Sequence, residues 1–166
     1  MADRSGFPLN VPLGQQPLGV PTQSTLGTAA AATLDTDATL AANSDSNVAT
    51  QKAVKTYIST VPQNSKSAAY TTVLTDAGKH ILHPSADTTA RTFTIDSNAN
   101  VAYSIGTVIT FVNQASAGVV TIAITADTMR LAGAGTTGSR TLAANGIATA
   151  LKLTSTEWII SGTGLT

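Results

Sequence analysis

The spacing of apolar residues differs between three parts of the chain, and the first part is rich in proline. Between residues 1 and 23, apolar side chains alternate with Pro8, Pro12, Pro17 and Pro21. Proline fixes φ and removes a backbone donor, so this segment cannot form a helix and is predicted to run extended. We interpret it as an anchoring arm, with a disordered tail as the alternative. The side chains available for anchoring are Leu9, Val11, Leu13, Leu18 and Val20.

The second part, residues 24–66, combines a linker of small polar residues with one helical pattern at about 50–61. Thr50 is a suitable N-cap, and Pro62 is expected to end the helix. Four apolar residues at i, i+3, i+4 and i+7 form one stripe: Val54, Tyr57, Ile58 and Val61. About three turns are marginally stable alone, so the stripe needs a partner. That partner is either the helix's own domain or two further copies in a short parallel trimeric bundle.

The third part, residues 67–166, has short runs of Thr, Val and Ile separated by Gly, Asn, Asp and Ser, a pattern typical of β-strands. Asn145-Gly146 favours the positive φ of a tight hairpin turn. Because no helical pattern lies between the strands, the fold class is mainly β, with an antiparallel β sandwich or barrel-like domain here. Strands are predicted at 72–75, 80–82, 92–95, 107–113, 119–125, 128–131, 147–153 and 158–161.

Composition narrows the functional classes. The 166 residues carry nine basic and nine acidic side chains and no cysteine. Nucleic acid and anionic membranes require clustered positive charge, so the balance argues against both partners. No apolar run approaches the roughly 20 residues of a membrane-spanning helix, and residues 1–10 lack the pattern of a secretory signal. Without cysteine there is neither a disulfide framework nor a thiolate nucleophile.

Motifs that could bind a cofactor or a metal lack the context that this chemistry needs. Residues 133–138 match G-x-G-x-x-G, but turn residues follow where a dinucleotide site needs a helix, and no ribose-binding acid lies about 20 residues on. Asp35 and Asp37 lack the further acids of a calcium loop and are interpreted as turn residues. His80 and His83 would point to opposite faces of a strand, although one histidine near a trimer axis could form a three-histidine site. We therefore predict no cofactor and no metal.

Catalytic patterns are also missing. Glu157 is the only glutamate, no pair of acids has a glycosidase spacing, and no G-x-S-x-G elbow occurs. Tyr70, Tyr103 and Trp158 could stack on a sugar, but Trp158 has the context of a core residue in the last strand. We predict no catalytic residues, and therefore not an enzyme.

One segment carries a resemblance to known proteins. Residues 34–58, LDTDATLAANSDSNVATQKAVKTYI, resemble a short module of fibre and adhesin-like virion proteins of tailed bacteriophages. The remainder, from Ala69-Tyr70-Thr71 through GTVITFVNQ to EWIISGTG, is similar to a β domain often found at the C-terminus of such proteins. The two regions together span all but roughly the first thirty residues.

The resemblance implies a non-enzymatic structural component of the virion, usually a homotrimer, with the N-terminus toward the particle and the β domain outward. The chain lacks the long shaft of a typical tail fibre, because the helical pattern leads directly into the β region. We therefore expect a short head fibre or capsid decoration protein that binds the major capsid protein or another virion protein through its arm. The alternative is a tail or baseplate fibre adhesin that acts in host attachment by binding a bacterial surface glycan.

Overall fold

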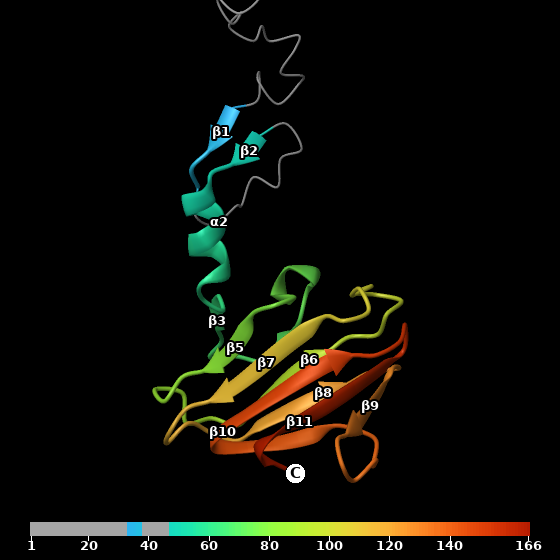
Figure 1. The fold of residues 1–166 in the computed structure, drawn as a ribbon. Helices are drawn as coiled ribbons and strands as arrows, with labels where there is room; N and C mark the ends of the chain where they lie inside the picture. The colour runs from blue at the N-terminus through green and yellow to red at the C-terminus, as the bar shows by residue number, and fades with distance from the viewer. Residues whose placement is uncertain (1–32, 38–46) are drawn as a thin grey trace, which may run out of the picture. The chain divides into compact units, whose positions relative to one another are not determined.

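The computed structural model describes residues 33–37 and 47–166, which divide between two compact units, Met1–Ser59 and Thr60–Thr166 (Figure 1). In the first unit, strand β1 (Thr33–Asp35) pairs in parallel with β2 (Asn47–Ala49), and helix α2 (Gln51–Ile58) follows. The Thr50 side chain accepts a hydrogen bond from Ala53 N (3.2 Å), which confirms the predicted N-cap. The helix ends at Ile58, and Pro62 keeps it from extending through Val61, because the residue before a proline disfavours the α conformation.

The second unit is built on one nine-stranded sheet that curls on itself. The mainly β fold class is therefore confirmed for the part of the chain that the structure describes. The strands are β3 (Gln63–Ser65), β4 (Tyr70–Thr71), β5 (His80–His83), β6 (Arg91–Ile95), β7 (Val108–Asn113), β8 (Val120–Ile124), β9 (Thr128–Leu131), β10 (Arg140–Lys152) and β11 (Glu157–Leu165).

Successive strands alternate between two wings of this sheet. The odd-numbered strands β3, β5 and β7 pair in parallel in one wing, and the even-numbered β4, β6 and β8 pair in parallel in the other. Strands β4 to β7 are thus each part of the crossover between two parallel strands of the other wing. The prediction of an antiparallel domain is wrong for these pairs, because the crossover that parallel strands need is supplied by a strand rather than by a helix.

Strand β10 joins the two wings. Residues 140–142 pair with β8, and residues 147–151 pair antiparallel with β7. Between these stretches the register shifts, and Asn145 has φ 61°. The predicted hairpin at Asn145-Gly146 is therefore wrong: the local conformation is the expected one, but it forms a bulge that bends one long strand. Figure 1 shows β10 and β11 running together along the sheet.

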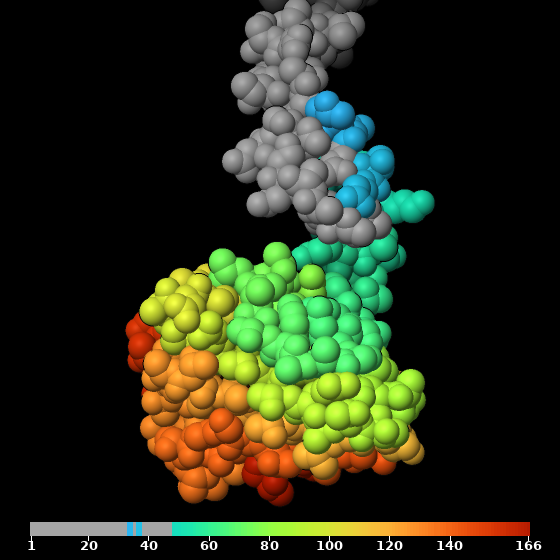
Figure 2. Space-filling model, turned by 180° about the vertical axis from the view of Figure 1, so that it is seen from behind, coloured from blue at the N-terminus to red at the C-terminus, as the bar shows by residue number. Residues whose placement is uncertain are grey.

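The core lies inside the curl. The rings of Phe93 on β6 and Phe111 on β7 stack at 6.5 Å between centroids, so the two wings touch through these side chains. Trp158 on β11 is fully buried and meets Tyr103 edge to face at 5.5 Å. Seen from behind, segments far apart in the sequence, coloured green, lime and orange, pack into one rounded surface (Figure 2).

Five of the eight predicted strands are confirmed within two residues, but β10 begins seven residues before the predicted 147–153 and β11 extends four residues beyond the predicted 158–161. Residues 72–75 were expected to be a strand, but β4 ends at Thr71 and a 3₁₀ turn occupies Leu74–Asp76. The Asp76 carboxylate accepts a hydrogen bond from Val73 N (2.9 Å) and closes this turn. The β unit begins at Thr60 rather than at residue 67, because Gln63–Ser65 already pairs with β5.

Candidate functional site

The apolar stripe of the helix is exposed. Val54, Tyr57 and Ile58 on α2 keep 40%, 48% and 72% of their surface accessible. Val61 is 59% exposed but lies beyond the end of the helix, in the second unit, so its place in a helical stripe is a wrong prediction. The structure thus brings three of the four predicted residues onto one helix. We call Val54, Tyr57 and Ile58 the helix stripe.

The proposed anchoring residues Leu9, Val11, Leu13, Leu18 and Val20 lie outside the described residues. Their role therefore stays a prediction from the sequence.

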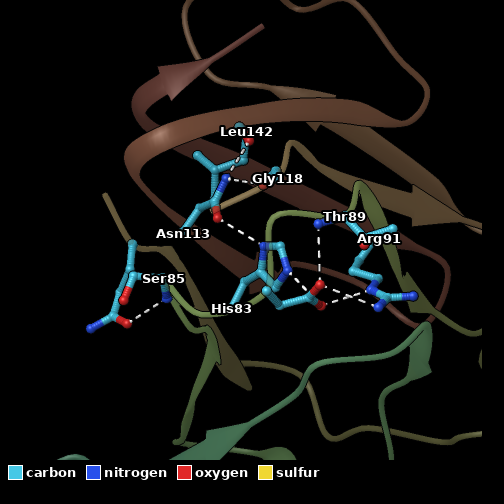
Figure 3. A network of polar contacts seen from close by, with 9 residues as sticks. His83, Ser85, Thr89, Arg91, Asn113, Gly118 and Leu142 are labelled. Carbon is cyan, nitrogen blue, oxygen red and sulfur yellow. Dashed lines mark hydrogen bonds and ion pairs between the residues drawn. The ribbon is translucent and has the colours of Figure 1, made fainter. Parts of the chain in front are cut away.

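A buried polar cluster in the second unit is centred on His83, at the end of β5 (Figure 3). The imidazole has no accessible surface. Its Nδ1 lies 2.9 Å from Asn113 Oδ1, and its Nε2 lies 3.1 Å from Asp87 Oδ2. We call His83, Asp87, Arg91 and Asn113 the histidine clasp.

Hydrogen bonding to two backbone carbonyls sets the orientation of the Asn113 amide in the clasp. Asn113 Nδ2 donates to Gly118 O (2.9 Å) and Leu142 O (3.1 Å), so Oδ1 must be the amide atom that faces His83. Nδ1 therefore faces an acceptor, and Nε2 faces a carboxylate, which also accepts.

The carboxylate of the clasp is held by several donors. Arg91 donates to it from Nε (2.7 Å) and Nη2 (3.2 Å), and Thr89 N donates to Oδ1 (3.1 Å). The hydrogen bonds from Arg91, together with those from His83 and Thr89, hold the pKa of Asp87 well below its usual range against the opposing effect of burial. Asp87 is thus a stable anion between the Arg91 guanidinium and the His83 ring.

The clasp connects loops that are distant in the sequence. Through Asp87 and Asn113 it fastens the β5–β6 loop to β7, to the β7–β8 loop and to β10. At Gly118 the backbone packs so closely that an added Cβ would lie 2.3 Å from Thr89 C. Because both ring nitrogens are occupied and the ring is fully buried, His83 is not placed to exchange a proton with a bound molecule.

A second buried cluster surrounds Lys152, at the end of β10. Its Nζ donates to Asn98 Oδ1 (2.9 Å), lies 4.0 Å from Asp127 Oδ2 and stands 5.2 Å from the centroid of the Trp158 ring. Asp127 in turn accepts from Asn98 N (3.0 Å). A buried charge is tolerated when it is paired and hydrogen-bonded, and Lys152 meets both conditions.

A third cluster supports the start of the β unit. The buried Asp76 carboxylate accepts from Asn64 Nδ2 (2.8 Å) and from the Tyr70 hydroxyl (2.7 Å). The Tyr103 hydroxyl donates to Val73 O (2.7 Å). Burial raises the pKa of Tyr103 to about 12 and, together with the hydrogen bond to Asp76, raises the pKa of Tyr70.

The glycine-rich motif is a loop between strands. Residues 133–138 connect β9 to β10, and a strand rather than a helix begins at Arg140, as expected. Arg130 donates from Nη1 to Gly135 O (3.0 Å) and is paired with Glu157 (2.9 Å). The Arg140 guanidinium donates to Thr136 O. The arginines therefore hold the loop to the adjoining strands.

The two histidines lie on opposite sides of β5, as predicted. His80 is only partly buried, and its Nε2 lies 3.1 Å from Gln63 Oε1. Within residues 33–37 and 47–166, no group of three or more His, Cys, Asp or Glu side chains is arranged to hold a metal ion. No helix in the same ranges is long and apolar enough to cross a membrane.

Sequence reasoning named His83, Tyr70 and Tyr103 for other roles, and it missed their polar partners and the Lys152 cluster. For Lys152 a signal existed, because it follows Ala148 and Ala150 at the alternating positions that face the core. Asp87 and Asn113 carried no comparable signal, since their partners are set by loops and by pairings distant along the chain.

No protein-family model, no curated protein and no solved structure matches the chain.

Proposed function

We propose that the chain is a non-enzymatic structural protein of a bacteriophage virion: a short homotrimeric fibre or decoration protein on the capsid exterior. Its N-terminal arm would bind the major capsid protein or another virion protein, and its β unit would project outward. The resemblance of residues 34–58 to a module of phage fibre proteins supports this proposal. The observation that carries it is the exposed helix stripe of Val54, Tyr57 and Ile58.

The physical argument starts from the size of the helix. Eight residues extend about 12 Å, and a helix this short is unstable in water without packing. Burying a large aliphatic side chain contributes on the order of 1.5–3 kcal/mol. Association of copies through the stripe would stabilise each helix and would cover the three exposed side chains at the same time.

The oligomeric state tests the first half of the proposal. Light scattering coupled to size exclusion should give the mass of three chains for the wild type. Val54→Asp should yield single chains, because it would bury an unpaired charge in the bundle. Thr56→Asp is the matched control, since Thr56 lies on the opposite side of α2 and is exposed. A wild-type mass of one chain at micromolar concentration would contradict the proposal.

Binding to the particle tests the second half. A chain that lacks residues 1–23 should remain a trimer but should no longer co-sediment with particles that lack this protein. Undiminished binding of the truncated chain would place the anchor elsewhere. Labelled antibody should mark the capsid in electron micrographs, whereas label at the tail or baseplate would favour the adhesin alternative.

A further inference from the structure

One wing of the sheet exposes an unusual outer surface. In β5, β7, β10 and β11, residues that face outward alternate with buried ones, and two rows of these outward residues are aliphatic. The strand register aligns one row as Leu82, Val112 and Ile147, and the other as Val108, Leu151 and Ile159. We call these six residues the aliphatic face. Val108 is 38% and Ile147 is 49% exposed, and the other four are half-buried.

The aliphatic face carries almost no charge. Between its two rows the register places His80, Thr110, Thr149 and Ser161. The charged residues at its margin, Glu157 and Arg130, form an ion pair with each other (2.9 Å). The face therefore offers no electrostatic complement to a charged partner and no repulsion to a second copy of itself.

The outer surface of the other wing has a different composition. The outward residues of β4, β6, β8 and the start of β10 form a threonine face: Thr71, Thr92, Thr94, Thr121 and Thr141, with Ala123. Both surfaces are built from the same kind of strand, so strand propensity does not explain why only one of them is aliphatic. Burial against a partner does explain the difference.

We propose that the aliphatic face is covered in solution by two further copies of this chain. This inference rests on the homotrimer proposed above. Contact through this face would make the β units part of the trimer, in addition to the helices.

The short connection between the helix and the sheet argues for this occupant. Only Ser59 to Pro62 separate α2 from β3, which is the first strand of the wing that carries the aliphatic face. From Ile58 to Gln63 the chain spans at most roughly 18 Å even when fully extended. If three helices associate, their β units are therefore held together at an effective concentration on the order of millimolar. At this effective concentration, another copy in the same assembly binds the aliphatic face in preference to a partner that is free in solution.

The absence of cysteine from the chain allows a direct test by thiol protection. Ser161→Cys would introduce a single thiol on the aliphatic face with almost no change in shape, because Ser161 is exposed and pairs with Thr149. Thr92→Cys places the control thiol on the threonine face, where the residue is also exposed. We expect a maleimide reagent to modify the Ser161→Cys trimer at least tenfold more slowly than the Thr92→Cys trimer. Adding Val54→Asp, which dissociates the helices, should bring the two rates together.

A charge at the same face provides a second measurement. Val108→Glu should raise the concentration at which the full-length trimer dissociates at least tenfold, and Thr92→Glu should leave it unchanged. Both residues are exposed, so each variant is expected to fold, and the fluorescence of buried Trp158 checks this.

The possible results separate this inference from the proposed function. If the wild type is a trimer and the Ser161→Cys and Thr92→Cys trimers react equally fast, the covered face is overturned and the helix-mediated trimer stays intact. Protection of the Ser161→Cys thiol only on intact particles would assign the face to another virion protein and would also overturn the inference. A monomeric wild type would contradict the homotrimer itself, and the inference would fail with it.

Discussion

Replacing Asn113 in the histidine clasp should destabilise the β unit more than any loss of packing volume explains. Asn113→Leu keeps a buried side chain of similar size but removes three hydrogen bonds, to Gly118 O, Leu142 O and His83 Nδ1. A buried polar group left without a partner costs about 1–3 kcal/mol. With three groups affected, and with some recovery by rearrangement and by burial of the leucine, we expect a loss of roughly 3–6 kcal/mol. That is a large share of the roughly 5–15 kcal/mol that stabilises a typical domain.

Urea unfolding measures this loss directly. Trp158 is the only tryptophan and is fully buried, so its fluorescence reports on the core of the β unit. The matched control is Gln114→Leu, because Gln114 is the next residue and is exposed, and its side chain accepts one hydrogen bond, from Ser85 N (2.9 Å). The control should lose no more than about 1.5 kcal/mol. Equal losses for the two variants would refute the reasoning that the clasp holds the loops together.

Three further predictions concern buried charges and ionisable groups. Lys152→Met should lose about 3–5 kcal/mol of unfolding free energy by leaving Asp127 buried without its cation, and adding Asp127→Asn should recover part of this loss in the same urea assay. Because the pKa of Asp87 is lower in the folded chain than the value of about 3.9 expected after unfolding, its stabilising effect is present above that pH and declines on acidification. Unfolding at stepped pH from 5 to 2 should therefore show a shallower slope for Asp87→Asn, and an unchanged slope would contradict the assignment. Tyr103, with its pKa raised to about 12 against about 10 in an unfolded chain, stabilises the fold below pH 10 and loses this effect as the pH rises toward 12, so Tyr103→Phe should reduce the alkaline loss of stability.

The positions of most strands could be predicted because they depend on local patterns. Alternation of apolar and polar residues locates β5 to β9 within two residues, and the N-cap at Thr50 locates the start of α2. The pairing of strands could not be predicted in the same way. Whether β5 pairs in parallel with β7 depends on the path of the 24 residues between them, and alternation carries no information about that path.

Asn145-Gly146 shows how a correct local signal leads to a wrong conclusion. Asn145 adopts positive φ, as the dipeptide indicates. Only glycine fits at position 146, since an added Cβ would lie 2.6 Å from Ala143 O. A hairpin and a bulge both need these properties, and only the partners on each side, β8 before the bulge and β7 after it, distinguish them.

In the candidate site, too, the features set by local sequence patterns could be predicted, and those set by strand pairing could not. The helix stripe follows from a spacing of three and four residues and could be predicted, except at Val61, where the helix has already ended. The histidine clasp combines residues from β5, the β5–β6 loop, β6 and β7, which come together only once the register is known. His83 alone gave no sign of its partners, and its pairing with Asn113 crosses 30 positions of sequence.

The edges of the sheet also bear on how the chain associates. In the middle of the strand order, β10 joins both wings by pairing with β7 and β8. The edges of the sheet are β3 with three residues, β4 with two, and β9 with four, which among the strands pairs only with β11. Edge strands this short offer few free backbone groups, so pairing between the edges of two chains would gain little. Association of this chain is therefore expected to use side-chain surfaces rather than sheet edges, and the helix stripe and the aliphatic face are two apolar surfaces of this kind in the described part of the chain.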